Sequence, residues 1–246
     1  NIDIPDGVTS IGAYAFSGCS NLSSIDIPDG VTSIGQYAFS GCSGLASIDI
    51  PDGITSIDSG VFSDCCGLTG IVIPNGVTSI GTYAFSGCSS LASIDIPDGV
   101  TSIGQYAFRD CSVLESLTIP SLYGHTLVWY FNNSSVPASL KSITLTRETS
   151  IVDSAFNGCS RLTSIDIPDV LTSIGSSAFR DCSSLTSIEI PNGVTSIGDY
   201  AFSGCSSLER VYISDLVAWC NIDFGNEYSN PLINGAKLYV NNALVT

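Results

Sequence analysis

Basic residues are scarce in this sequence. Its 246 residues include seven Lys and Arg against 23 Asp and Glu, and the formal net charge is −16. Nucleic-acid binding needs Lys and Arg along a phosphate track, so this class of function is disfavoured. The imbalance is uneven, since residues 1–108 carry ten Asp and no basic residue, while residues 109–246 hold seven basic and thirteen acidic residues.

Residues that carry catalysis or bind metals are also few. The single histidine, His125, excludes a His-Glu-x-x-His zinc motif, and the ten cysteines include no Cys-x-x-Cys pair. No glycine-rich phosphate loop follows a predicted strand, and a nucleophilic triad would have to use His125. No apolar run reaches the length of a membrane span. The sequence therefore predicts a protein without enzymatic activity, resident cofactor or transmembrane segment.

A repeat of 23 residues runs through most of the chain. Phenylalanine marks it, with a single longer interval of 25 residues between Phe131 and Phe156. A fixed spacing between about 20 and 50 residues is typical of solenoids, propellers and other arrays. The marker positions are Phe16, Phe39, Phe62, Phe85, Phe108, Phe131, Phe156, Phe179 and Phe202.

One repeat is predicted to form a short coil. In the copy that spans residues 184–206, residues 187–190 alternate between outward and inward as a strand does, and residues 191–193 (Pro-Asn-Gly) predict a turn. Residues 194–197 are expected to return as a second extended segment. Residues 199–203 have room for about one turn of α-helix or 3-10 helix.

Stacking these coils would place each apolar residue beside its own copy, at the β-ladder spacing of about 4.8 Å. The core then consists of columns, one of phenylalanine and one of leucine. We predict an α/β repeat solenoid of about ten coils, with short parallel strands and short helical turns. The leucines of the second column are Leu22, Leu45, Leu68, Leu91, Leu114, Leu140, Leu162 and Leu185.

We predict one domain over residues 1–246, because the coils of a continuous array contact only their neighbours. Regular repeats cover 1–121 and 159–210, an irregular repeat with an insertion covers 122–158, and a divergent C-terminal coil or cap covers 211–246. Since Asn1 falls in the middle of a repeat, we expect the sequence to be part of a longer protein whose export signal and anchor lie outside it.

The C-terminal cap is predicted to close the array. Trp219, Phe224 and Leu232 are expected to cover the end of the phenylalanine column. Residues 237–240 then predict a final strand, and Asn241-Asn242 predicts a turn after it.

The pattern Leu-x-x-Ile-x-Ile-Pro, then Val-x-x-Ile-Gly, then Ala-Phe-x-x-Cys closely resembles the BspA-like (Treponema-type) leucine-rich repeat family. The resemblance covers nearly the whole chain. It implies a right-handed superhelix whose inner face is lined by the strands equivalent to residues 187–190. It also implies a secreted or cell-surface bacterial protein that acts in adhesion or binding, and it supplies no catalytic residues.

Eight of the ten cysteines follow the repeat. In-register side chains point in parallel, so their Cβ atoms stay farther apart than the roughly 3.8 Å that a disulfide prefers. We therefore predict a buried column of free thiols. Cys66 and Cys220 fall outside the column and are predicted to be exposed.

The residue between the two inward isoleucines of the first strand must face outward, and it is acidic in most copies. Carboxylates about 5 Å apart repel each other, so this acidic ladder predicts attraction for a basic partner and a weak association of calcium. The alternative is a solvated face that only keeps the protein soluble. The ladder consists of Asp3, Asp26, Asp49, Asp95, Asp166 and Glu189.

The insertion supplies a second set of candidate ligand contacts, which are Tyr123, His125, Trp129 and Tyr130. Insertions in solenoids form loops on one face, commonly the binding face. The alternative is a bulged coil whose aromatic side chains repack the core.

An outward threonine column from Thr9 to Thr195 resembles the flat arrays of ice-binding proteins, although threonine is also a common strand residue. We predict a non-catalytic binding or adhesion module that is a monomer and binds a protein or an extracellular-matrix ligand. The main alternative is a passive spacer that displays other modules. An ice-binding protein and a hydrolase are more distant alternatives.

Overall fold

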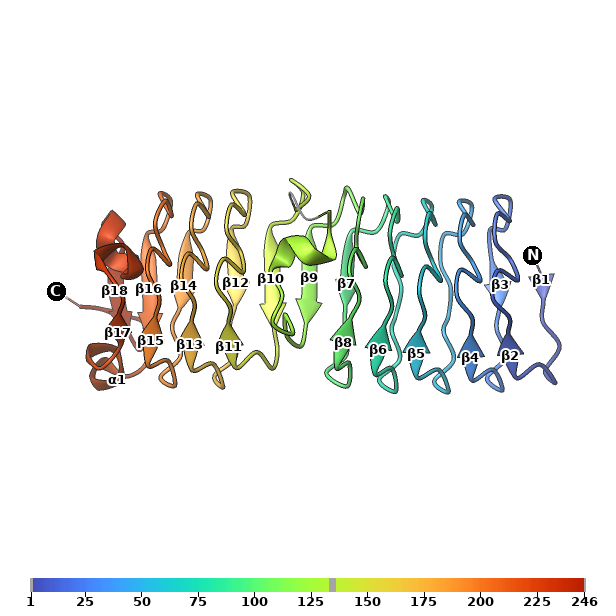
Figure 1. Cartoon of the computed structure of the whole chain (residues 1–246), viewed down its shortest axis with the longest axis horizontal. Coiled ribbons are helices and arrows are strands. Elements are labelled where there is room, and N and C mark those ends of the chain that lie inside the picture. Colours follow the sequence, from blue (N-terminus) through green and yellow to red (C-terminus); the bar gives the residue numbers. More distant parts are fainter. Residues whose placement is uncertain (1, 133–135, 246) are drawn as a thin grey trace. The chain divides into compact units, whose positions relative to one another are not determined.

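The computed structural model describes residues 2–132 and 136–245. Its contacts group the chain into two compact units. The first is Asn1–Leu117 with Val128–Ser139, and the second is Thr118–Leu127 with Leu140–Thr246. Each unit is a stack of short coils (Figure 1). The single domain over residues 1–246 stays a prediction.

In the first unit, the two extended segments of each coil form separate sets of parallel strands. The pairing register equals the sequence period, since Ile2 pairs with Ile25 and Ser10 pairs with Ser33. The strands of the first segment are β1 (Ile2–Asp3), β3 (Ile25–Asp26) and β7 (Ser93–Asp95). Those of the second segment are β2 (Ser10–Ile11), β4 (Ser33–Ile34), β5 (Ser56–Ile57), β6 (Ser79–Ile80) and β8 (Ser102–Ile103).

The second unit repeats this arrangement with longer strands. The first segments are β10 (Ser142–Leu145), β12 (Ser164–Asp166), β14 (Ser187–Glu189), β16 (Arg210–Ile213) and β18 (Lys237–Val240). The second segments are β11 (Ser150–Ile151), β13 (Ser173–Ile174), β15 (Ser196–Ile197) and β17 (Asp223–Phe224). β9 (Ser116–Ile119) and the 3-10 helix η1 (Leu127–Tyr130) contain residues of both units.

The corner after the second strand is a row of turns. Tyr37 and Gly41 adopt the left-handed backbone conformation, with φ of 55° and 74°, which interrupts any helix. The amide of Ser40 donates to the carbonyl of Tyr37 in its own turn at 3.1 Å, whereas the amide of Phe39 donates to the carbonyl of Val61 in the next coil at 3.0 Å. Amides thus alternate between the local turn and the neighbouring coil. The prediction of a helical turn in the regular repeats was wrong.

The predicted columns form the core of each unit. Phe85 is fully buried, and its ring centroid lies 5.7 Å from that of Phe62 and 6.0 Å from that of Phe108. In the second unit, the Phe179 ring lies 5.2 Å from Phe156. These separations fall in the range that favours aromatic pairs. All eight leucines of the predicted column are buried, so the inward register is confirmed.

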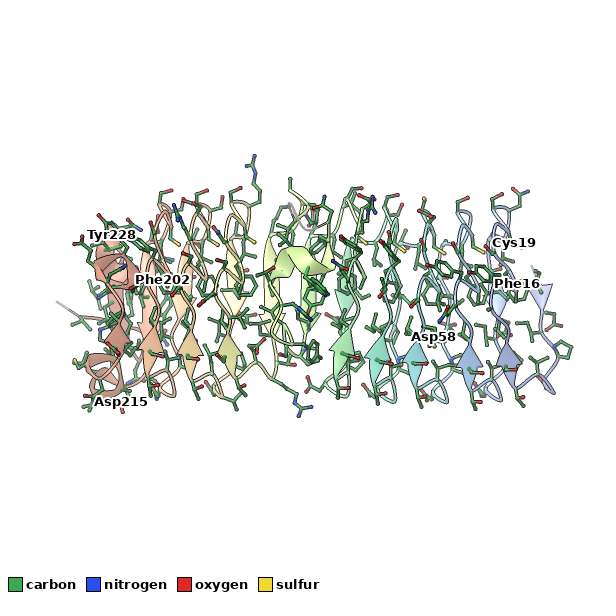
Figure 2. All side chains as sticks on the ribbon, viewed as in Figure 1. Phe16, Cys19, Asp58, Phe202, Asp215 and Tyr228 are labelled. Atoms are coloured by element: carbon green, nitrogen blue, oxygen red, sulfur yellow. The ribbon has the colours of Figure 1, made fainter. Side chains whose placement is uncertain are left out.

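Two short 3-10 helices cover the last coil, namely η2 (Glu227–Ser229) and η3 (Pro231–Asn234). The amide of Phe202 donates to the carbonyl of Tyr228 at 3.2 Å, and the side-chain amide of Asn234 donates to the carbonyl of Phe202 at 3.4 Å. Figure 2 shows Tyr228 and Phe202 at the same end of the coil. The end of the phenylalanine column is therefore met by η2 and η3.

Trp219 does not take the predicted place over this column. It lies on α1 (Leu216–Cys220), whose N-cap residue Asp215 is at the opposite end of the coil from Tyr228 (Figure 2). Trp219 packs edge-on against Phe224 of β17, with centroids 5.4 Å apart. Among the three residues predicted to form the cover, only Leu232 lies in a segment that reaches Phe202.

The final strand and turn are confirmed. β18 runs parallel to β16, with Lys237 beside Arg210. Asn241 and Asn242 both have positive φ, 49° and 66°, as a tight hairpin turn requires. The chain then returns as β19 (Ala243–Leu244), antiparallel to β18.

Candidate functional site

The acidic ladder lies on the outward side of the first strands, a surface that we call the strand face. All six of its residues are exposed. In the first unit Asp3 is directly beside Asp26 across β1 and β3. In the second unit the hydroxyl of Thr144 donates to the carboxylate of Asp166 at 3.2 Å. The ladder ends at β14, because the neighbour of Glu189 on β16 is Tyr212.

The four residues of the insertion do not form one cluster of exposed contacts. Tyr123 and His125 are half-buried residues of the second unit, and Trp129 is a half-buried residue of the first. Tyr130 is fully buried, so its side chain is not available to a ligand and its assignment as a loop contact was wrong. In the first unit, the carbonyl of Tyr130 accepts a hydrogen bond from the amide of Phe108 at 2.9 Å. Its backbone thus replaces the corner of a regular coil.

The segment before η1 is fixed by a buried carboxylate. Glu148 is only 5% exposed. It accepts hydrogen bonds from the Ser121 hydroxyl at 3.0 Å and from the amide of Leu122. A buried carboxylate that is bonded in this way holds the backbone in one conformation, so Glu148 is a structural residue.

The predicted thiol column is present, and its cysteines are free. Cys66 and Cys220 are exposed, as predicted. Burial raises the pKa of the Cys42 thiol to about 11 and that of the Cys111 thiol to about 12, because the charged thiolate loses its hydration. A thiol that stays protonated is a poor nucleophile and metal ligand, so the column carries no chemistry.

The threonine column is tied to the backbone. The hydroxyl of Thr101 donates to the carbonyl of Thr78 at 3.1 Å, and that of Thr172 donates to the carbonyl of Thr149 at 2.9 Å. These hydroxyl protons bond between coils of the protein, which accounts for threonine at this position without a ligand.

The strand face of the second unit changes its chemistry at β16. The position held by Ser187 on β14 is Arg210 on β16 and Lys237 on β18, in direct register. The position of Glu189 is held by Tyr212 and then Tyr239. The two tyrosine rings lie 5.3 Å apart at an angle of 35°. We call Arg210, Lys237, Tyr212 and Tyr239 the C-terminal patch.

Two hollows flank this patch. A groove of about 700 Å³ is bordered by Arg210, Lys237 and Tyr239 together with neutral polar residues, which include Thr186, Ser206, Ser207 and Asn234. A smaller hollow of about 310 Å³ is lined by Glu189 and Tyr212 on its strand side. The larger groove combines two cations, an aromatic ring and several hydroxyl and amide groups, which is the composition of a binding site for a polar anion.

Sequence reasoning missed the C-terminal patch because the chain leaves the 23-residue period after Ile213. A signal was nevertheless present. Residues 210–212 (Arg-Val-Tyr) and 237–239 (Lys-Leu-Tyr) repeat the order basic, apolar, tyrosine. They align with residues 187–189 (Ser-Ile-Glu) of the preceding regular strand.

The described residues contain no helix that is long and apolar enough to cross a membrane. Within the same residues, no three His, Cys, Asp or Glu side chains gather as a metal site would require.

Comparison with known proteins identifies the repeats. Residues 1–114, 61–148 and 130–223 match the BspA type leucine rich repeat region. No curated protein sequence is significantly similar to the chain.

Several solved structures are similar to the chain. A leucine-rich repeat protein from Bacteroides ovatus is 33% identical, with a TM-score of 0.63 over 97% of this chain and 63% of that one. The leucine rich repeat protein of T. pallidum is 31% identical, with a TM-score of 0.51 over 75% of this chain and 77% of that one. The chain thus spans less than two thirds of the Bacteroides protein.

Proposed function

Since the chain belongs to the BspA-type leucine-rich-repeat family, we propose that it is a non-catalytic binding module of a secreted or cell-surface bacterial protein. Its binding surface is the strand face, and its partner is a protein or an extracellular-matrix ligand. The chain acts as a monomer, and its coils wind with the right-handed sense implied by the family resemblance. The extracellular location rests on that resemblance alone.

One observation carries this proposal: the inward residues of the strands keep their character from coil to coil, whereas the outward residues change. Glu189, Tyr212 and Tyr239 occupy one register position on β14, β16 and β18. The inward neighbours at the preceding position are all aliphatic, namely Ile188, Val211 and Leu238. Because the same coil folds with a serine or a carboxylate outside, the fold does not require tyrosine and arginine there. These residue types are enriched at binding surfaces.

The strand face of the first unit suits a different kind of contact. Its exposed carboxylates at Asp3, Asp26, Asp49 and Asp95 form a surface of one sign, in a part of the chain without Lys or Arg up to residue 108. A basic partner would associate with this surface at a rate that falls with salt. The same carboxylates would associate weakly with calcium.

Passive display of other modules is the second candidate function. It is favoured by the near identity of the copies between residues 1 and 110, which repeat even their outward Ser and Asp residues. A uniform surface offers little to distinguish one ligand from another. This reading applies to the first unit, since the second unit carries the C-terminal patch.

A retention assay tests the proposal. The chain would be passed over immobilised matrix proteins, mucin and plant polysaccharides, together with the double variant Tyr212→Ala, Tyr239→Ala and the control Tyr14→Ala, whose side chain is also exposed. We expect one ligand class to retain the parent and the control but to lose the double variant, provided that all three melt at similar temperatures. Retention of nothing would favour the spacer, and turnover of a ligand would contradict a non-catalytic role.

A further inference from the structure

We propose that the groove beside the C-terminal patch binds a carboxylated saccharide, with Arg210 and Lys237 on the carboxylate and Tyr239 against the sugar ring. This inference rests on the proposed function, because it names a ligand class for one part of the strand face. The occupant is a sugar acid, such as a hexuronate or another sugar that carries one carboxylate.

The charges of the groove point to an anion. Arg210 and Lys237 are direct neighbours on adjacent parallel strands, where like charges repel, and both are exposed. Their register position is serine on β14, so the fold tolerates a neutral residue there. The chain has only seven basic residues, and two of them meet at this point. An anionic ligand would relieve the repulsion between them.

The number of charges favours a single carboxylate. Glu209 lies beside Arg210, with Oε2 at 3.6 Å from Nη2, and both side chains are exposed. Lys237 forms no salt bridge within residues 2–132 and 136–245. The groove therefore has one cation in excess, which matches one carboxylate. A polyanion would in addition be repelled by the net charge of −16.

The other walls of the groove suit a sugar. Thr186, Ser206, Ser207 and Asn234 offer hydroxyl and amide groups that both donate and accept hydrogen bonds, as sugar hydroxyls do. The Tyr239 ring is half-buried and inclined by 35° to the Tyr212 ring, and it borders the groove. Tyrosine is a rigid residue with an apolar ring and a polar tip, which fits the apolar faces and hydroxyl edges of a pyranose.

An acidic peptide fits less well. Peptides bound along a sheet rely on an unpaired strand edge or on apolar pockets for alternate side chains. Among the residues that line the groove, Leu208 is the one large aliphatic side chain, and it is only 3% exposed. The groove thus lacks an anchor for a peptide side chain, whereas its volume of about 700 Å³ is in the range of small-molecule sites.

The test is calorimetric titration of the whole chain with trigalacturonate and with sialyllactose. The methyl ester of trigalacturonate is the matched neutral ligand, and tetraglutamate is the peptide ligand. We expect one of the two acidic sugars to bind at least tenfold more tightly than the ester or tetraglutamate. Lys237→Gln should reduce this affinity at least tenfold, while Lys141→Gln, which removes the only other lysine, should leave it unchanged.

Tyr239→Ala should also weaken binding, and Tyr239→Phe should restore it if the ring is what matters. Equal melting temperatures of Tyr239→Phe and the parent would show that the last coil is intact. The proposal is overturned if neither acidic sugar binds, if the ester binds as well as the acid, or if Lys237→Gln has no effect. Preferential binding of tetraglutamate would assign the groove to a peptide instead. Retention of a matrix protein without saccharide binding would overturn this inference alone and leave the proposed function standing.

Discussion

The thiol of Cys88 donates a hydrogen bond to the carbonyl oxygen of Phe62 in the preceding coil, at 3.2 Å. The same oxygen accepts the amide of Cys65 within its own turn, also at 3.2 Å. A carbonyl has two lone pairs, so both are satisfied inside the core by this arrangement. At the last coil, Asn234 replaces cysteine as the donor to Phe202. The cysteine column therefore links consecutive coils through weak hydrogen bonds and needs no disulfide.

Alkaline pH should destabilise the protein through these thiols. The pKa of Cys111 is about 12 in the folded protein, against an ordinary value of 9.0, so the native state keeps a proton that the unfolded chain releases between these values. The stability that this thiol contributes is present below pH 9 and is lost as the pH rises towards 12. From pH 8 to pH 10 the parent should lose about 1.4 kcal/mol more unfolding free energy than Cys111→Ala. Urea denaturation at both pH values measures this difference, and equal losses would contradict the buried thiol.

Thiol labelling should separate the cysteines by exposure. Cys66 and Cys220 should react with a maleimide in the native protein, followed by the half-buried Cys19. The seven buried thiols should react only after denaturation, because the reagent cannot reach them and they stay protonated. Intact mass before and after adding urea gives both counts. A native disulfide between Cys19 and Cys42 would refute the column of free thiols.

The phenylalanine column should dominate stability. Phe85 is fully buried between two other rings, so Phe85→Ala should lower the unfolding free energy by about 3–5 kcal/mol. Gln105→Ala, at a partly exposed position of the same unit, should change it by less than about 0.5 kcal/mol. Chemical denaturation of both variants tests the register, and similar losses at the two sites would contradict it.

A glycine that follows each second strand sets how closely two coils approach. At Gly35 an added Cβ would lie 2.5 Å from the backbone nitrogen of Ala13 in the preceding coil, whereas at Gly12, the same repeat position, nothing lies within 4 Å. We expect Gly35→Ala to destabilise the chain by about 1–3 kcal/mol through overpacking. Gly12→Ala should be neutral or stabilise it by up to about 1 kcal/mol, since alanine restricts the unfolded chain. Thermal melting of the pair tests the coil contact, and equal shifts would show that it is absent.

The columns could be predicted because each depends on one residue type at one spacing. Phe85 and Leu91 must be inside in every copy for any coil to be stable, so the period alone places them. The corner could not be predicted in this way, because its left-handed residues include Tyr37, a residue type that rarely adopts this conformation. Neighbouring coils hold it there by accepting its amide, since Tyr37 donates to the carbonyl of Ser59 at 3.0 Å.

The candidate site was predicted only where it follows the period. The exposure of Asp26 and Asp166 follows from the alternation of a strand. Tyr130 was assigned to a loop because its neighbours are irregular, yet it fills the core. The C-terminal patch requires the pairing of Arg210 with Lys237, which are 27 residues apart in a chain whose period is 23. Only the structure supplies that longer step.

The acidic ladder should reveal itself through salt. Asp3, Asp26 and Asp49 are exposed at the same position of three consecutive repeats, and adjacent carboxylates at this spacing repel by about 1 kcal/mol per pair in water. The triple variant Asp3→Asn, Asp26→Asn, Asp49→Asn should therefore melt no lower than the parent at low salt, and should gain less from added sodium chloride or calcium, because salt screens a repulsion that it no longer has. The control replaces Asp6, Asp64 and Asp98 by Asn, which removes the same charge from exposed positions that are not adjacent in the stack. Thermal melting across a salt and calcium series should show the reduced response in the ladder variant alone. If the ladder variant and the control respond alike, only net charge matters, and the strand face of the first unit is a solvated surface without a cation or basic partner of its own.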